Sequence, residues 1–248
     1  MRNIKLTIEY DGSSYAGWQR QKNAMTVQQK LEESLEKLCG EPVNVIGSGR
    51  TDSGVHARGQ VSNFKTSSTI PPERYSYALN SMLPSDIRIN CSKEVPMDFH
   101  ARFSATGKKY RYSIINNTHG TAIDRQYLHH VSSPLDIQAM KEAAKIFEGT
   151  HDYAGFMATG SPVKSTVRTI YESKLIQDGS LLHFTVTGNG FLYNMVRIMA
   201  GTLIDVGKGK ISANVIPDII AYRKREKVGA TAPANGLFLE EVYYDELL

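Results

Sequence analysis

Apolar and polar residues alternate along the first ten residues of the chain. Ile4, Leu6, Ile8 and Tyr10 are each separated by one polar residue. A repeat of two is typical of a strand with one buried and one exposed face. We therefore predict that the chain opens with a strand.

A second pattern lies between Thr26 and Gly40, where apolar residues recur every three to four positions. This is the spacing of an amphipathic helix. Thr26 followed by Gln29 is the sequence of a capping box, and Gly40 suits the end of a helix. We predict a helix between these two caps.

The rest of the chain repeats both patterns. In chain order they predict strands over 43–48 and 60–64, a helix from Pro71 to Leu83, a strand over 108–115, a helix over 136–147, strands over 167–176 and 181–187, helices over 190–205 and 217–225, and a strand over 236–244. Two rounds of strands and helices indicate the α+β class, with two halves, residues 1–103 and 104–248, packed into one sheet-centred body.

Composition narrows the class of protein without fixing it. Among 248 residues, 29 Lys and Arg stand against 25 Asp and Glu, a net charge of +4. Clustered basic residues favour a nucleic-acid partner and a solvated surface about equally. The two cysteines do not form a disulfide framework, and we expect buried free thiols. No apolar run approaches the roughly 20 residues that cross a bilayer, so we expect a cytoplasmic protein without a membrane partner.

One glycine-rich stretch, GSGRTDSGVHA from Gly47 to Ala57, carries candidate chemistry. Glycines permit positive φ angles and close backbone approach, so this loop can hold Asp52 against a bulky ligand. The alternative is an ordinary turn in which Asp52 bonds backbone amides. The residues of the turn alone leave both interpretations open.

The whole stretch resembles the active-site loop of the tRNA pseudouridine synthase A family, whose pattern is GRTDxGVHA. Three further segments are similar to segments of that family: GKKYRY at 107–112, GTHDY at 149–153 and GFLYNMVR at 190–197. They occur in the family's order along nearly the entire chain. Ser53 replaces the alanine common in relatives, and Tyr193 and Asn194 stand where many relatives carry histidines. Neither departure touches Asp52.

The resemblance implies a fold and an activity. The fold is the α+β pseudouridine synthase fold, two ferredoxin-like halves forming a mostly antiparallel sheet with a central active cleft. The activity is the isomerisation of uridine to pseudouridine at positions 38, 39 and 40 of the tRNA anticodon stem-loop. The implied enzyme is a homodimer that holds one tRNA across both subunits and needs no cofactor.

The resemblance also implies the site residues. Asp52 would be the catalytic nucleophile, Tyr110 would stack on the uracil and help move a proton, and Arg197 would pair with Asp52. The implied substrate-binding residues are Arg50, His56, Arg58, Lys108 and Tyr110. The residues alone favour the structural interpretations: a core tyrosine for Tyr110, a solvated charge for Arg197 and a histidine packed in a loop for His56.

The reaction explains the need for a carboxylate. It breaks the bond between ribose C1′ and uracil N1 and joins C1′ to C5. An aspartate with a reference pKa of about 3.9 is ionised at neutral pH. It can stabilise positive charge at C1′, attack C1′ covalently, or support proton removal from C2′, and all three routes stay open.

Neither a metal nor a redox cofactor is expected. The histidines are scattered, without the spacing of a zinc site, and the isomerisation is redox-neutral. Two alternative functions remain: a nucleoside or base hydrolase that uses the same acid, and a noncatalytic RNA-binding module. The loop containing Tyr15, Trp18, Arg20 and Lys22 suits RNA contact and an ordinary packed turn equally.

Overall fold

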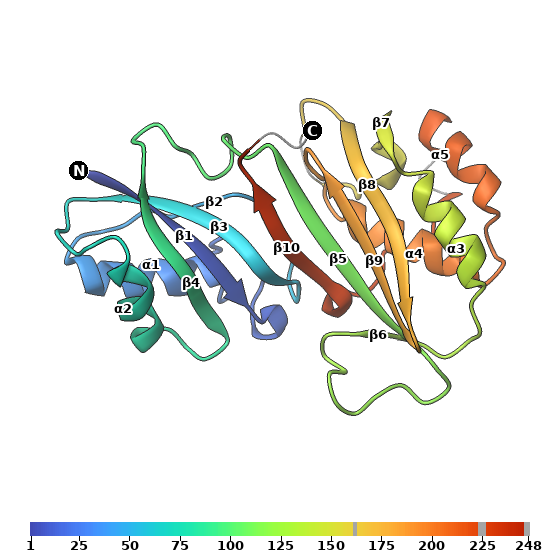
Figure 1. Ribbon diagram of the computed structural model, residues 1–248, viewed down its shortest axis with the longest axis horizontal. Coiled ribbons are helices and arrows are strands. Elements are labelled where there is room, and N and C mark those ends of the chain that lie inside the picture. The colour runs from blue at the N-terminus through green and yellow to red at the C-terminus, as the bar shows by residue number, and fades with distance from the viewer. Residues whose placement is uncertain (161–162, 223–226, 246–248) are drawn as a thin grey trace. The chain divides into compact units, whose positions relative to one another are not determined.

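The computed structural model describes residues 1–160, 163–222 and 227–245. The chain divides into two compact units (Figure 1). The first unit is Met1–Thr106 together with Phe238–Leu248, and the second is Gly107–Leu237. Each unit pairs its own strands and packs its own helices, which agrees with the predicted α+β class.

The first unit contains an antiparallel sheet with two helices. In chain order its elements are β1 (Arg2–Tyr10), α1 (Val27–Cys39), β2 (Ile46–Gly47), β3 (His56–Thr66), α2 (Arg74–Met82), β4 (Ile87–Val95) and β10 (Leu237–Tyr243). β1 pairs antiparallel with β3 and with β4, and β2 pairs antiparallel with β3. This is the β-α-β-β-α-β succession of a ferredoxin-like half. β10 adds a parallel pairing with β3.

The first strand and the first helix are as predicted. Ile4, Leu6 and Ile8 on β1 are fully buried, which confirms the alternation. At the start of α1, the Thr26 hydroxyl accepts the backbone N–H of Gln29 at 3.3 Å. At its end, Gly40 has a φ of 70°, the left-handed conformation that glycine adopts at low cost.

The second unit is built around mostly antiparallel strands. Its elements are β5 (Gly107–Asn116), β6 (His129–Val131), α3 (Ile137–Lys145), β7 (Gly149–Asp152), β8 (Val167–Asp178), β9 (Leu181–Gly188), α4 (Met195–Gly207) and α5 (Ile216–Tyr222). β9 lies between β5 and β8, and β7 extends the sheet beyond β8. α3 packs against α4 and β8, and nearly all of α4 is buried.

Several predicted elements differ from the observed ones. The predicted strand over 43–48 shrinks to Ile46–Gly47, and β4, β6 and β7 were not predicted. β4 was missed because a register shift in its pairing with β1 breaks the alternation. The helix predicted from Gly190 starts only at Met195, after Asn194 in a left-handed conformation. α5 ends at Tyr222, and the remainder of the predicted helix over 217–225 lies outside the described residues.

Two further features differ from expectation. Both cysteines are free, but Cys39 is half-buried and Cys91 is exposed, so the expected burial is wrong. Cys91 points outward because it follows the bulge-shifted alternation of β4. The C-terminal strand β10 belongs mainly to the first unit because it pairs with β3. The division into halves 1–103 and 104–248 stays a prediction.

Candidate active site

The loop that carries Asp52 connects β2 to β3 and is anchored through the residue before the acid. Thr51 is buried, and its hydroxyl lies 2.8 Å from the hydroxyl of Tyr10 at the end of β1. The Thr51 carbonyl accepts the backbone N–H of Trp18 at 3.1 Å. Burial raises the pKa of Tyr10 above its usual value, so this hydroxyl stays neutral. Asp52 itself is half-buried.

A second anchor lies at the start of the loop. The Ser48 hydroxyl donates to the side-chain oxygen of Gln60 at 2.7 Å, and the amide nitrogen of Gln60 donates to the Gly49 carbonyl at 3.0 Å. Ser48 and Gln60 are fully buried. Buried hydrogen bonds of this kind fix the backbone because breaking one leaves a polar group without water.

Two glycines let a neighbouring segment pack tightly on the Asp52 loop. Gly17 has a φ of +93°, and a Cβ on it would lie 2.5 Å from the Thr51 carbonyl oxygen. A Cβ on Gly12 would lie 2.0 Å from the Val55 carbonyl oxygen. Only glycine fits at such distances. Segment 12–18 therefore packs directly against the backbone of the Asp52 loop.

His56 also contacts this segment. It is 1% exposed, and its ring stacks on Phe238 of β10 at a centroid distance of 4.7 Å. Its Nδ1 accepts the backbone N–H of Gly12 at 3.0 Å and lies 3.1 Å from the Asp11 carboxylate. These contacts favour the interpretation of a histidine packed in the loop. Its predicted substrate contact stays a prediction.

Two arginines flank Asp52 in the sequence. Arg50 and Arg58 are both exposed. The Arg58 guanidinium lies 5.5 Å from the centre of the Phe238 ring, a cation–π distance. Four predicted site residues thus lie within ten positions of one another in the first unit, on the loop between β2 and β3 and at the start of β3: Arg50, Asp52, His56 and Arg58.

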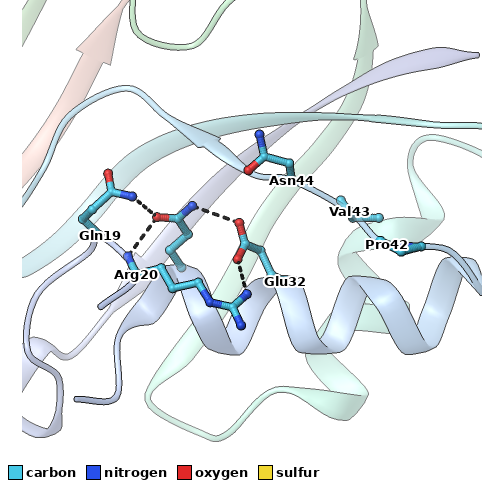
Figure 2. A pocket seen from close by; sticks show the side chains of 7 residues that line it. Gln19, Arg20, Glu32, Pro42, Val43 and Asn44 are labelled. Carbon is cyan, nitrogen blue, oxygen red and sulfur yellow. Dashed lines mark hydrogen bonds and ion pairs between the residues drawn. The ribbon is translucent and has the colours of Figure 1, made fainter. Parts of the chain in front are cut away.

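The loop with Trp18 is a packed structure as far as its aromatic residues are concerned. Tyr15 and Trp18 are 5% and 1% exposed, so neither ring is available to RNA. Arg20 is exposed and pairs with Glu32 on α1 at 2.9 Å, beside an open groove of about 440 Å³ (Figure 2). Gln28 connects this ion pair to the backbone of the loop. Its side-chain amide donates to Glu32 at 2.9 Å, and its side-chain oxygen accepts the Arg20 backbone N–H at 3.0 Å.

In the second unit, Tyr110 occupies a central position on β5. It pairs with Val186 of β9 and is 7% exposed. The ring of Phe191 meets its ring edge to face, with centroids 5.1 Å apart and an interplanar angle of 81°. Lys108 lies two residues earlier on the same strand and is half-buried.

Arg197 lies in the first turn of α4, and its guanidinium is held by two acceptors of the second unit. Its Nε donates to the Ala232 carbonyl at 2.8 Å, and its Nη1 donates to the side-chain oxygen of Asn194 at 3.0 Å. Asn194 has a φ of 58°, a conformation that asparagine tolerates better than most residues. Sequence reasoning missed Asn194 and Ala232 as supports of Arg197. The helix predicted over 190–205 included Asn194, so no sequence signal pointed to this contact.

The predicted site residues therefore form two sets. Arg50, Asp52, His56 and Arg58 belong to the first unit, and Lys108, Tyr110 and Arg197 belong to the second. Across the described ranges, no group of three or more His, Cys, Asp or Glu side chains is placed to hold a metal ion. Within the same ranges, every helix is too short or too polar to cross a bilayer.

Comparison with known proteins gives consistent matches. A family model described as tRNA pseudouridine synthase matches residues 6–104 and 143–245. The chain is 56% identical to tRNA pseudouridine synthase A of Acetivibrio thermocellus over 98% of this chain and 100% of the relative. It is 55% identical to the protein of the same name from Ruminiclostridium cellulolyticum, and 50% identical to tRNA pseudouridine synthase A 2 of Clostridium perfringens, with the same coverage.

Among solved structures, a Cbf5-Nop10-Gar1 complex aligns with 81% of this chain and 45% of that chain, at 14% identity and a TM-score of 0.35. The family match and the full-length relatives define the class of protein. The chain belongs to the tRNA pseudouridine synthase family. Membership confirms the predicted family and its fold. Asp52 and Arg197 fall inside the matched ranges, whereas Lys108 and Tyr110 fall between them.

Proposed function

We propose that this protein is an isomerase that converts uridine to pseudouridine at positions 38, 39 and 40 of the tRNA anticodon stem-loop. Its full-length relatives carry the name tRNA pseudouridine synthase A. The observation that carries the proposal is the anchored loop that presents Asp52. Asp52 follows a buried threonine held at both its hydroxyl and its carbonyl, yet remains half-exposed.

The reaction conserves all atoms of the substrate. The C1′–N1 bond breaks, the detached uracil turns, and C1′ bonds to C5. The C5 proton then leaves and N1 ends with a proton, so no oxidant or reductant is needed. Asp52 acts at C1′ as nucleophile, as a charge stabiliser, or in support of proton removal from C2′. The loop anchors favour each route equally because all three need a fixed carboxylate.

Tyr110 and Arg197 complete the proposed chemistry. The Tyr110 ring stacks on uracil while its hydroxyl moves the proton between C5 and its acceptor. Arg197 pairs with Asp52 and keeps it ionised and correctly aimed. Its support comes from Asn194 and Ala232, which hold two of the guanidinium nitrogens in fixed positions.

Three basic residues bind the substrate in this proposal, and a fourth residue supports them. Arg50 holds the extruded base outside the stem, while Arg58 and Lys108 neutralise phosphates. His56 supports the loop that meets the substrate. We further propose a cytoplasmic homodimer with one tRNA across both subunits, which joins basic surface from two chains. A net charge of +4 per chain supports binding of a polyanion.

The test uses tRNA transcripts with tritium at C5 of uridine. The wild-type protein should release tritium and leave pseudouridine at positions 38, 39 or 40, as mapped by chemical sequencing. Asp52→Asn should bind tRNA but release none, because the amide can neither attack C1′ nor offset its charge. Asp178→Asn, at the exposed turn between β8 and β9, serves as a matched control and should retain full activity.

The alternatives give different products. A hydrolase would release free uracil and leave an abasic ribose, and a noncatalytic module would leave the tRNA unchanged. Substantial pseudouridine formation by Asp52→Asn would remove Asp52 from the chemistry.

A further inference from the structure

A large aromatic side chain stands exposed on the segment between β4 and β5. Phe103 is 76% exposed, unlike the buried aromatic residues of the core. The His100 ring lies 4.3 Å from it between centroids, and the Arg102 guanidinium lies 5.5 Å from the ring centre. We name His100, Arg102 and Phe103 the Phe103 platform. A single exposed aromatic residue is common on protein surfaces, so the case for a binding site depends on the groups fixed around Phe103.

The backbone under this platform is fixed by two buried asparagines. The Asn3 side chain donates to the carbonyls of Pro96 and Phe99 at 2.9 and 3.0 Å. The Asn63 side-chain oxygen accepts the backbone N–H of Ala101 at 2.8 Å. Asn3 and Asn63 are at most 1% exposed. The segment is therefore attached to the sheet by side chains that water does not reach.

The platform also has its own internal structure. Nδ1 of His100 accepts the backbone N–H groups of Arg102 and Phe103 at 3.2 and 3.3 Å. The Tyr244 hydroxyl donates to the Ala101 carbonyl at 2.8 Å. These bonds fold the backbone of residues 100–103 against the imidazole, and the Phe103 side chain stays exposed to solvent. A ligand that meets a preorganised ring loses little conformational entropy of the protein on binding.

The chemistry of the platform selects its partner. An aromatic face beside a guanidinium fits a ligand that offers a π-face and a negative charge close together, as an unpaired nucleotide does. Asp98 is exposed in the same segment and repels a phosphate. The attraction between the platform and a phosphate therefore depends on Arg102 at short range. A second copy of this chain is the alternative occupant of this surface, and the experiments below separate the two.

We propose that the Phe103 platform is an RNA-stacking site, at which an unpaired base of the tRNA stacks on Phe103 and Arg102 contacts the adjacent phosphate. This inference rests on the proposed function and adds a contact with the substrate away from Asp52 in the sequence. Stacking on aromatic side chains tolerates any base. The platform therefore contributes affinity for RNA and no base preference.

The first experiment measures the Kd of an unmodified tRNA transcript for the Asp52→Asn protein, which binds without turnover. Adding Phe103→Ala should raise the Kd about tenfold, within the roughly 1–3 kcal/mol of one stacked base. Phe103→Tyr should restore the parent value. Phe103→Ala should leave the salt dependence of binding unchanged, whereas Arg102→Ala should reduce its slope by about one.

The chain offers a matched control on α2. Tyr77 is 71% exposed and has the Arg74 guanidinium 5.8 Å from its ring centre, but Arg74 lies one helical turn away on the same helix. Tyr77→Ala removes an equally exposed ring of the same unit. If the His100-packed platform binds RNA, and not any exposed ring beside an arginine, this variant should leave the Kd for tRNA unchanged.

A direct readout uses fluorescence. The chain has one tryptophan, Trp18, which is 1% exposed. Phe103→Trp adds an exposed indole, whose emission should be quenched when tRNA stacks on it. The parent protein should show little quenching, because its tryptophan lies in the core.

The outcomes separate this inference from the proposed function. Unchanged affinity in Phe103→Ala, together with unquenched Phe103→Trp, would overturn the stacking site while pseudouridine formation stands. Platform-dependent tRNA binding without any pseudouridine would overturn the proposed function and leave the stacking site in place. A dimer-to-monomer shift in Phe103→Ala during sedimentation, with normal affinity restored at high protein concentration, would assign the platform to contact between copies and overturn the inference.

Discussion

At the scale of single residues, the hydroxyl pair of Tyr10 and Thr51 fixes the residue directly before Asp52. Its distance is 2.8 Å, and both residues are buried. Tyr10→Phe removes one buried hydrogen bond, worth about 1 kcal/mol, and lets the backbone before Asp52 move. We expect a single-turnover rate about fivefold lower with unchanged tRNA affinity.

Because the same bond is broken from both sides, Thr51→Val should add little to Tyr10→Phe in a double-mutant cycle. Tyr153→Phe is the control, since its buried hydroxyl donates to the Phe147 carbonyl in the second unit. It should lower stability without changing the single-turnover rate. Additive losses for Tyr10 and Thr51 would argue against a shared positioning role.

Tyr110 permits a separation of stacking from proton transfer. Tyr110→Phe keeps the ring, which meets Phe191 edge to face, and removes only the hydroxyl. We expect normal tRNA binding and a turnover at least 10²-fold lower, a loss of about 2.7 kcal/mol in transition-state stabilisation. Single-turnover kinetics with saturating enzyme measure this rate. A near-normal rate would leave stacking as the role of Tyr110.

Arg197 is expected to be sensitive even to lysine. The guanidinium donates through Nε to Ala232 and through Nη1 to Asn194, a planar arrangement that an ammonium group cannot reproduce. Arg197→Lys should show a partial loss of single-turnover rate, and Arg197→Ala a larger one. Asn194→Ala should resemble the lysine variant. Equal rates for all these proteins would show that Arg197 does not act on Asp52.

The sequence predicted the family of the chain better than the contacts that hold these residues. The motif around Asp52 and the segment ending at Arg197 both indicated the family that the comparisons confirm. The contact between Tyr10 and Thr51 spans 41 positions, and that between Arg197 and Ala232 spans 35. No periodic pattern encodes such contacts, since they depend on how the elements pack. The proposed roles of Asp52, Tyr110 and Arg197 stay predictions.

At the scale of elements, Glu41 ties the segment after α1 to the end of β3. Its carboxylate accepts hydrogen bonds from the Thr66 hydroxyl and from the hydroxyl and backbone N–H of Ser67. These bonds, that of Thr66 foremost, lower the pKa of Glu41 from 4.5 to about 2. A lowered pKa contributes stability that is present above pH 4.5 and is lost as the pH falls towards 2.

Glu41→Gln should therefore flatten the decline of stability between pH 4.5 and pH 2. Thermal unfolding of the wild type and the variant across this window measures the effect. Glu33→Gln, on the exposed side of α1, is the control and should keep the wild-type slope. An unchanged slope in Glu41→Gln would mean that the link between α1 and β3 does not depend on this charge.

Elements with a long uninterrupted pattern were predicted well. β1 and α1 match their predicted positions because each presents one regular buried face and, for α1, two clear caps. β4 was missed because only Ile87 and Ile89 alternate before the bulge changes the buried side. β6 and β7, with three and four residues, are too short to show any period. β6 and β7 form because they pair with neighbouring strands, and their own residues carry no strand pattern.

At the scale of the whole molecule, the charge predicts how binding responds to salt. The net charge is +4, and the candidate binding residues include exposed Arg50 and Arg58. The logarithm of tRNA affinity should fall linearly with the logarithm of salt concentration, because each phosphate contact releases counterions. Arg58→Ala should reduce the slope by about one. Filter binding at several salt concentrations measures it, and a salt-independent affinity would contradict the proposed phosphate contacts.

The parallel pairing of β10 with β3 has a consequence for the order of events during translation. The ribosome makes β1 to β4 first, then the entire second unit, and only afterwards residues 237–243. Until then β3 has β1 as a neighbour but lacks its second neighbour along His56 and Ala57, and the His56 ring lacks its stacking partner Phe238. One part of the structure around the Asp52 loop is thus finished late in synthesis. A nascent chain stalled before Phe238 holds the whole GRTDSGVHA motif without the strand that packs on His56, and its open strand edge is exposed to chaperone binding or aggregation.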